Sequence, residues 1–332
     1  IVFNYEYGGV SVSQTQVVSY GGRPTLPTRV GKTGYSLAAW NTSSDGNGTD
    51  YSTNNADSEW VIYENLTLYA RFEINKYNVL FYVGASLVSS YRADYGTSVV
   101  YPSQNITRDN EGIYSFKFDH WAGTYPSEVV AENRTYTAVF NQFNAVFSKN
   151  STTDIVYCEG AEALIDVMTL TKATEVSFRN VTMLLSADVI NELAAYSNLL
   201  IECLRIERTS EMSLFVPSST VYAFNFAGDG NKISIFRNPI EISVTIEGLA
   251  KGPFYSYNVY HESPAGREEI TGVSVSDETI TFSATEFSNY TITFGFNPIF
   301  VYGGIAVIVI VLLIIILIVV AIVKKRRNRA II

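Results

Sequence analysis

The longest apolar stretch of the sequence lies near its end, at residues 299–323, and contains no charged side chain. At about 1.5 Å of rise per residue, a helix over this stretch would cross a hydrocarbon layer of roughly 30 Å. A buried helix of a soluble domain rarely stays apolar on every face for so long. The pattern therefore predicts a transmembrane helix over residues 298–323 that contacts membrane lipid.

A cluster of cations follows this stretch directly. Lys and Arg beside a membrane span stay on the cytoplasmic side, and Phe300 and Tyr302 suit the outer interface as aromatic anchors. We therefore expect a single-pass protein of the plasma membrane, with an extracellular N-terminal region and a cytoplasmic tail, residues 324–332. The residues expected to set this topology are Lys324, Lys325, Arg326, Arg327 and Arg329.

Upstream of the apolar stretch, apolar and polar residues alternate with a period of two, which is typical of half-buried strands. Over residues 1–142 the alternation occurs in two similar copies, each with a Tyr-Gly turn and one matching tryptophan, Trp40 or Trp121. We expect both tryptophans to anchor cores, with exposed sugar-stacking platforms as the alternative. The duplication predicts two separately folded β modules, module 1 (residues 1–75) and module 2 (residues 76–142).

The order of these signals is specific. Copy one reads V-x-F, Y-G, G-Y-x-x-x-x-W and T-L-Y-A-x-F, and residues 1–140 as a whole resemble the internalin-type B-repeat, also called the Listeria–Bacteroides repeat. The resemblance implies compact β-grasp-like units, strung in tandem along microbial surface proteins as spacers or adhesive modules. Copy one departs from the family at Ala39, where Gly is usual, and copy two has Asp119-His120 before its tryptophan.

Residues 143–297 show a different pattern. A strand-like run at Glu175–Leu185 leads into residues 186–196, where Ser186 is a good N-cap and Val189, Ile190, Leu193 and Ala194 form one apolar face, so we expect a helix. Period two then returns over residues 240–247, and Asp229-Gly230 predicts a hairpin turn.

The last part of this region, about residues 170–296, is similar to a C-terminal β-sandwich-like module of bacterial surface proteins, which implies a structural domain next to the anchor. The segments that carry the similarity are 238–246, 257–261, 279–285 and 287–292. The expected fold class is mainly β: two β-grasp-like modules, a β-sandwich-like domain with one helix at residues 143–297, and a single transmembrane helix.

Charge is distributed unevenly along the chain. Before the apolar stretch, 18 Lys and Arg stand against 32 Asp and Glu, a formal charge of −14 compared with −9 for the whole chain. Proteins bind nucleic acid largely through cations that neutralise phosphates. The balance therefore excludes nucleic acid as an expected partner.

Candidate catalytic chemistry is sparse. His120 and His261 are the only histidines, lie in different predicted domains and belong to no nucleophile or ligand motif, so we expect both at the solvated surface. Residues 45–50 resemble a calcium loop, but positions six and twelve are Asp50 and Ala56 instead of Gly and Glu, which favours a plain turn. We predict no catalytic residue, metal or cofactor, and no enzyme activity.

Two kinds of covalent modification are open. Cys158 and Cys203 could form one disulfide or remain two buried thiols. Asn-x-Ser/Thr tripeptides, the acceptors of N-glycosylation, all precede the apolar stretch, and their use depends on the source organism. They begin at Asn41, Asn47, Asn65, Asn105, Asn133, Asn150, Asn180 and Asn289.

The function expected first is structural and adhesive, with the β modules as stalk and contact surface for an extracellular protein or glycan. The alternative is the stalk and anchor of a surface hydrolase whose catalytic domain lies upstream of residue 1. A receptor is disfavoured because the short tail has no room for a signalling domain. Ile1 is interpreted as a processed or cropped start. An L-P-x-T-G sorting motif is absent, so we expect a retained helix anchor.

Overall fold

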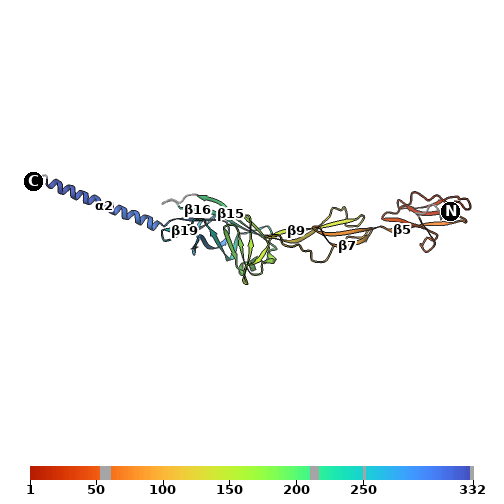
Figure 1. Cartoon of the computed structure of the whole chain (residues 1–332), viewed down its shortest axis with the longest axis horizontal. Helices are drawn as coiled ribbons and strands as arrows, with labels where there is room; N and C mark the ends of the chain where they lie inside the picture. The colour runs from red at the N-terminus through yellow and green to blue at the C-terminus, as the bar shows by residue number, and fades with distance from the viewer. Residues whose placement is uncertain (53–60, 210–216, 250–251, 330–332) are drawn as a thin grey trace. The chain divides into compact units, whose positions relative to one another are not determined.

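The computed structural model describes residues 1–52, 61–209, 217–249 and 252–329 (Figure 1). It is mainly β, and the described residues form two α-helices, α1 (Ala187–Leu193) and α2 (Pro298–Arg329). The chain divides into two compact units, one of Ile1–Arg108 with Phe118–Asn141 and the other of Asp109–Lys117 with Gln142–Ile332. The predicted fold class is confirmed.

Module 1 is a five-stranded sheet in the order β2-β1-β5-β3-β4, in which β1 and β5 are parallel. Its core is small: Phe3, Trp40 and Leu68 are fully buried, and the Trp40 ring meets Phe3 edge-on at 4.8 Å between centroids. The core position predicted for Trp40 is confirmed. The strands are β1 (Val2–Tyr7), β2 (Val10–Thr15), β3 (Tyr35–Asn41), β4 (Asp50–Ser52) and β5 (Thr67–Ile74).

Module 2 repeats this plan in a four-stranded sheet ordered β7-β6-β9-β8, with β6 and β9 parallel. Phe81 lies opposite Tyr136 in the same register that places Phe3 opposite Leu68 in module 1, as an internal duplication requires. Trp121 is only partly buried and packs against Phe81. The strands are β6 (Lys76–Val83), β7 (Ser86–Asp94), β8 (Tyr114–Ala122) and β9 (Arg134–Asn144).

Most of the second unit is a β-sandwich. One hydrophobic cluster joins buried residues of two seven-stranded sheets. The first sheet contains β10 (Val146–Ser148), β11 (Thr153–Tyr157), β13 (Ala173–Ser177), β14 (Val181–Leu185), β18 (Ile235–Thr245), β22 (Thr279–Glu286) and β21 (Ser274–Ser276). The second contains β12 (Glu162–Asp166), β15 (Asn198–Thr209), β16 (Ser218–Gly228), β17 (Asn231–Ile233), β23 (Asn289–Phe296), β19 (Tyr255–Ser263) and β20 (Gly266–Glu269). A short 3₁₀ turn, η1 (Val167–Thr169), follows β12.

Of the local structures predicted for the sandwich, the start of one helix is confirmed and one strand is wrong. The Ser186 hydroxyl accepts the Val189 N–H at 3.3 Å and starts α1 as predicted, but the helix ends at Leu193 and Ala194 is exposed. The expected strand Glu175–Leu185 is wrong, because Phe178 N–H bonds the Val181 carbonyl and the chain turns there between β13 and β14.

Two other expectations for the sandwich are confirmed. Ile240, Ile242, Val244 and Ile246 are all buried, as the period of two predicted. The turn between β16 and β17 is made by Asp229-Gly230, whose φ angles of 48° and 79° suit a tight hairpin.

Helix α2 follows β23 after one residue, Asn297, whose side chain accepts the Ile299 N–H at 3.0 Å and caps the helix. Pro298 occupies the first helical position, where its missing N–H costs nothing. The 23 residues Pro298–Val320 are long and apolar enough to cross a membrane, and none is buried inside the protein. The side chains of the cations after residue 323 lie outside the described part of the structure.

Candidate functional site

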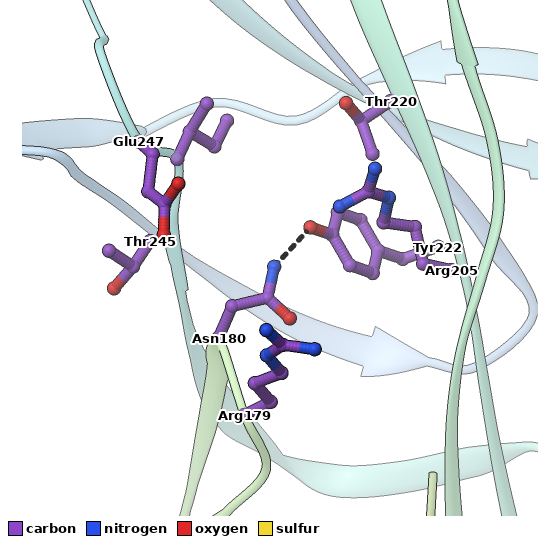
Figure 2. Close-up of a pocket in the computed structure, with 8 residues that line it drawn as sticks. Arg179, Asn180, Arg205, Thr220, Tyr222, Thr245 and Glu247 are labelled. Atoms are coloured by element: carbon purple, nitrogen blue, oxygen red, sulfur yellow. Dashed lines mark hydrogen bonds between the residues drawn. The ribbon is translucent and has the colours of Figure 1, made fainter.

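A cavity of about 250 Å³ opens where one end of the two sandwich sheets meets (Figure 2). The β13–β14 turn and the end of β18 supply one wall, and β15 and β16 supply the other. We call this cavity the arginine pocket. Its lining residues are Arg179, Asn180, Arg205, Thr220, Tyr222, Thr245, Ile246 and Glu247.

Two hydrogen bonds hold the back of the arginine pocket, one between the two sheets and one within the first sheet. The Asn180 Nδ2 donates to the Tyr222 hydroxyl at 2.7 Å, and the Thr245 N–H donates to the Asn180 carbonyl at 2.8 Å. Tyr222 is only 2% exposed, so its ring is fixed by the sandwich core. The wall is therefore preformed.

The charges of the arginine pocket have no partner within it. Arg179 and Arg205 are both exposed, and neither forms an ion pair among the residues that the structure describes. Figure 2 shows Glu247 across the pocket from Tyr222 and Arg205. In the described structure its carboxylate likewise has no ion-pair partner. Sequence reasoning missed this site because the two arginines belong to no motif.

His261 corrects the expectation that both histidines are solvated. It is 7% exposed, lies on β19 next to the ring of Tyr290, and its Nε2 is 2.8 Å from Ser288 Oγ. The Ser288 hydroxyl donates to the Glu262 carbonyl at 2.8 Å. Because a hydroxyl has one proton to donate, the imidazole must donate to serine, which is the reverse of nucleophile activation.

His120 is exposed as expected, with Nδ1 2.8 Å from the Asp119 carboxylate. The two side chains are neighbours on β8, and no group of three or more potential metal ligands occurs among the described residues. His120 therefore has a hydrogen-bond partner in the adjacent residue, and this pair by itself does not form a catalytic or metal-binding arrangement.

The calcium-like loop forms a turn whose carboxylates take protein partners. The Asp45 carboxylate accepts from the Ser43 hydroxyl and the Asn47 N–H, and Asp50 pairs with Arg71 at 3.0 Å. The turn predicted from the sequence is confirmed, while Ala56, the twelfth position, lies outside the described residues.

Asn41 lies at the centre of that turn and is 1% exposed. Its Nδ2 donates to the carbonyls of Gly46 and Gly48 and, at 2.7 Å, to the Asp50 carboxylate. Its Oδ1 accepts the N–H groups of Ser43 and Gly48. We call this arrangement the Asn41 clasp. It closes the loop between β3 and β4.

Burial separates the eight glycosylation tripeptides. A glycan is attached through the Asn Nδ2, and at Asn41 and Asn180 that nitrogen is already bonded inside the fold. The other six asparagines are exposed, so their use stays a prediction: Asn47, Asn65, Asn105, Asn133, Asn150 and Asn289.

The two cysteines are buried free thiols of the sandwich core. Burial raises the pKa of each thiol to about 12, and the neighbouring Cys158 contributes to the shift at Cys203. Thiolate, the reactive form, is therefore scarce at neutral pH. A disulfide between them was one of the two alternatives given by the sequence, and it is not tested by this arrangement.

Comparison with known proteins gives one family and two relatives. Residues 1–71 match the Listeria-Bacteroides repeat domain. A protein of Evansella cellulosilytica that carries the name Gly-rich membrane protein is 33% identical over 130 residues, 38% of this chain and 14% of the relative. A second protein of the same organism carries the name membrane protein. It is 29% identical over 139 residues, which is 40% of this chain and 19% of the relative.

The matched segments thus span less than a fifth of either relative. No solved structure matches the chain significantly. The repeat predicted for the first copy is confirmed, and the resemblance proposed for the sandwich stays a prediction.

Proposed function

We propose that the chain is a single-pass membrane protein of the cell surface whose β modules act as stalk and contact surface. The observation that carries the proposal is the direct junction at Asn297, where a folded sandwich strand passes into an apolar helix with no intervening linker. The match of residues 1–71 to a repeat of surface proteins and the membrane-protein names of the two relatives support it.

The proposed orientation places the sandwich outside and residues 324–332 in the cytoplasm, because Lys and Arg beside a span stay inside. The test attaches one epitope before Ile1 and another after Ile332, and adds protease to intact cells. The outer epitope should disappear while the inner one survives. Digestion of the inner epitope alone would reverse the topology.

Surface chemistry supports a role in contact. Tyr20 and Tyr63 are 83% and 61% exposed and form a T-shaped pair at 5.2 Å, a rigid amphipathic surface on module 1. Strands β2 and β7 each lie at a sheet edge, where unpaired backbone groups can accept an added strand. We propose an extracellular protein or glycan as the partner.

Adhesion is tested with cells that display the full chain. They should bind a matrix or a second cell saturably, and deletion of residues 1–142 should reduce binding while the anchored sandwich is still displayed. Equal binding by both forms would remove the modules from the contact surface.

The runner-up function is the stalk of a surface hydrolase. The observation that favours it is the length of the two relatives. The matched segments make up 14% and 19% of them, so most of each relative lies outside the segment that it shares with this chain. Sequencing the reading frame upstream of residue 1 decides between the two: further repeats support adhesion, and a hydrolase domain supports the stalk.

A further inference from the structure

We propose that the arginine pocket binds a carboxylate-bearing sugar unit of an extracellular glycan. This inference rests on the proposed surface role and names the ligand class for one site. The observation behind it is that Arg179 and Arg205, which come from opposite walls of one cavity, have no acidic partner in the described structure.

The charge balance of the chain gives each of these two arginines many possible acidic partners, and what sets the pair apart is that both line one cavity. Before the apolar stretch, 18 cations stand among 32 acidic residues, so a cation has many carboxylates to pair with. Several other cations do pair in this way, as the partly buried Arg71 does with Asp50 and the exposed Lys149 with Glu175. Two guanidinium groups left unpaired at one cavity favour an anionic ligand, because the guanidinium fork binds carboxylates in a bidentate manner.

The rest of the lining favours a polyhydroxylated ligand. Thr220, Thr245, Asn180 and Tyr222 bring hydroxyl and amide groups to the cavity, and Ile246 is its one apolar side chain. A volume of about 250 Å³ is below the range typical of drug-sized ligands, which suits a single sugar unit. Polar groups predominate in this lining, which suits an acyl chain or an apolar peptide side chain less well.

Glu247 separates a sugar acid from an inorganic anion. Its carboxylate lies across the pocket from Arg205 and can accept hydrogen bonds from sugar hydroxyls. Sulfate has no proton to donate to the Glu247 carboxylate at neutral pH, and phosphate has at most one. Both anions would also be repelled by the negative charge of that carboxylate. The pocket should therefore prefer a ligand that carries its acid at one end and hydroxyls at the other.

The pocket is also built before any ligand arrives. Thr220 and Tyr222 are buried, and the bond from Asn180 to the Tyr222 hydroxyl ties the two sheets together behind the arginines. Preformed polar groups bind without paying to order the wall.

The experiment is isothermal titration of the full chain in detergent micelles at low salt. The probes are sodium glucuronate, glucose, sodium sulfate, sodium phosphate and N-acetyl-alanine, the last as a mimic of a peptide carboxyl end. The variants are Arg179→Gln, Arg205→Gln and Glu247→Gln. Arg237→Gln is the matched control, because Arg237 lies on β18 outside the pocket and donates to Glu192 through its backbone N–H, which the substitution keeps.

Glucuronate should bind more tightly than glucose, sulfate and phosphate, and more weakly as salt is added. Each of Arg179→Gln and Arg205→Gln should weaken glucuronate about tenfold or more, the loss typical of a charge-assisted hydrogen bond. Arg237→Gln should bind like the wild type. Glu247→Gln should reduce the ratio of the affinity for glucuronate to the affinity for sulfate. Circular dichroism should show that all variants keep the native fold.

Three results would overturn the proposal: glucose that binds as well as glucuronate, glucuronate binding that survives both arginine substitutions, or no binding of any probe. Tighter binding of N-acetyl-alanine would assign the pocket to a peptide, and tighter binding of sulfate or phosphate to a free anion. Either result would exclude a carboxylate-bearing sugar as the ligand of the arginine pocket. The titration is independent of topology and of cell adhesion, so its failure and failure of the proposed surface role are distinguishable.

Discussion

The four strands that modules 1 and 2 have in common follow the same order, but the two cores are filled with different side chains. In both, an aromatic residue of the first strand meets a tryptophan edge-on, Phe3 with Trp40 at 4.8 Å and Phe81 with Trp121 at 5.0 Å. The interplanar angles are 69° and 70°. The tryptophan is 1% exposed in module 1 and partly exposed in module 2.

The last strand shows the greater divergence. Leu68 of module 1 corresponds to Tyr136 of module 2, and Leu66 corresponds to Arg134. Arg134 is 2% exposed and donates to the Tyr136 hydroxyl at 3.2 Å and to the Val129 carbonyl. Its guanidinium lies over the Tyr125 ring at 4.7 Å. A buried arginine is thus accommodated among neutral groups.

The comparison shows which features the repeat requires. Parallel pairing of the first and last strands and the aromatic–tryptophan contact occur in both copies. The remaining core positions accept aliphatic side chains or a tyrosine–arginine network, provided that most polar atoms find partners.

The largest effect should follow removal of the buried tryptophan. Trp40→Ala leaves a cavity in a core of three fully buried residues, so it should destabilise module 1 by about 3–5 kcal/mol. Trp121→Ala should lower the stability of module 2 by a clearly smaller amount, because part of that ring is already exposed to water. Hydrogen exchange read by mass spectrometry over residues 1–74 and 76–142 measures both. Equal loss of protection in the two variants would contradict the inference from burial.

A second effect should be confined to module 1. Asn41→Ala removes the side chain that satisfies both carbonyls and N–H groups of the β3–β4 loop, so we expect a loss of about 2–3 kcal/mol. The equivalent position in module 2 is Ala122, where no clasp exists to lose. The matched control Ala122→Asn should change stability little. Urea unfolding followed by proteolysis compares the two, and a neutral Asn41→Ala would show that water replaces the clasp.

Sequence reasoning worked where a repeating pattern specified the environment of a residue. The duplication follows from the matching turns and tryptophans of the two copies, the burial of Trp40 from the usual core role of such a residue, and the buried face of β18 from alternation. The β13–β14 hairpin was missed because its turn, Phe178–Asn180, contains neither Gly nor Pro. His261 was misplaced although it alternates with the buried Val259 on β19, a signal that the period of two already contained.

The arginine pocket could not be found in this way. Arg179 lies in a turn and Arg205 at an irregular register of β15, and the packing of two sheets brings them to one cavity. Neither local composition nor spacing reports such a contact. What the sequence does contain is the scarcity of cations before the apolar stretch, which makes each unpaired cation worth locating once the fold is known.

A third effect tests the buried arginine of module 2. Arg134→Leu copies the residue of module 1, and we expect stability within about 1 kcal/mol of the wild type. The reason is that the guanidinium is buried without a carboxylate, and its Nε has no hydrogen-bond partner in the described structure, so its removal relieves a cost that offsets the lost bonds. Urea unfolding measures the change. A loss of several kcal/mol would show that the tyrosine–arginine network stabilises the module.

The smallest effect concerns acid and the β3–β4 loop of module 1. Hydrogen bonds from Ser43 and Asn47 hold the pKa of the Asp45 carboxyl below its ordinary value of 3.8. Bonds from Asn41 and Arg71 lower the pKa of Asp50 in the same way. A folded-state pKa below the unfolded value means that the unfolded chain binds protons first. The stabilisation is therefore present above about pH 4 and is lost as the pH falls through the lower folded-state values.

Asp45→Asn and Asp50→Asn should consequently differ most from the wild type at pH 5 and least near pH 2 in urea unfolding. Glu132→Gln of module 2 is the control: its carboxylate is exposed, has no hydrogen bond in the described structure, and should leave the difference between the two pH values unchanged. Because both aspartates lie at the exposed surface, solvent screens their interactions and the effect should be small. A difference from the wild type that grew as the pH fell would mean that the loop is held by its backbone and the Asn41 clasp alone.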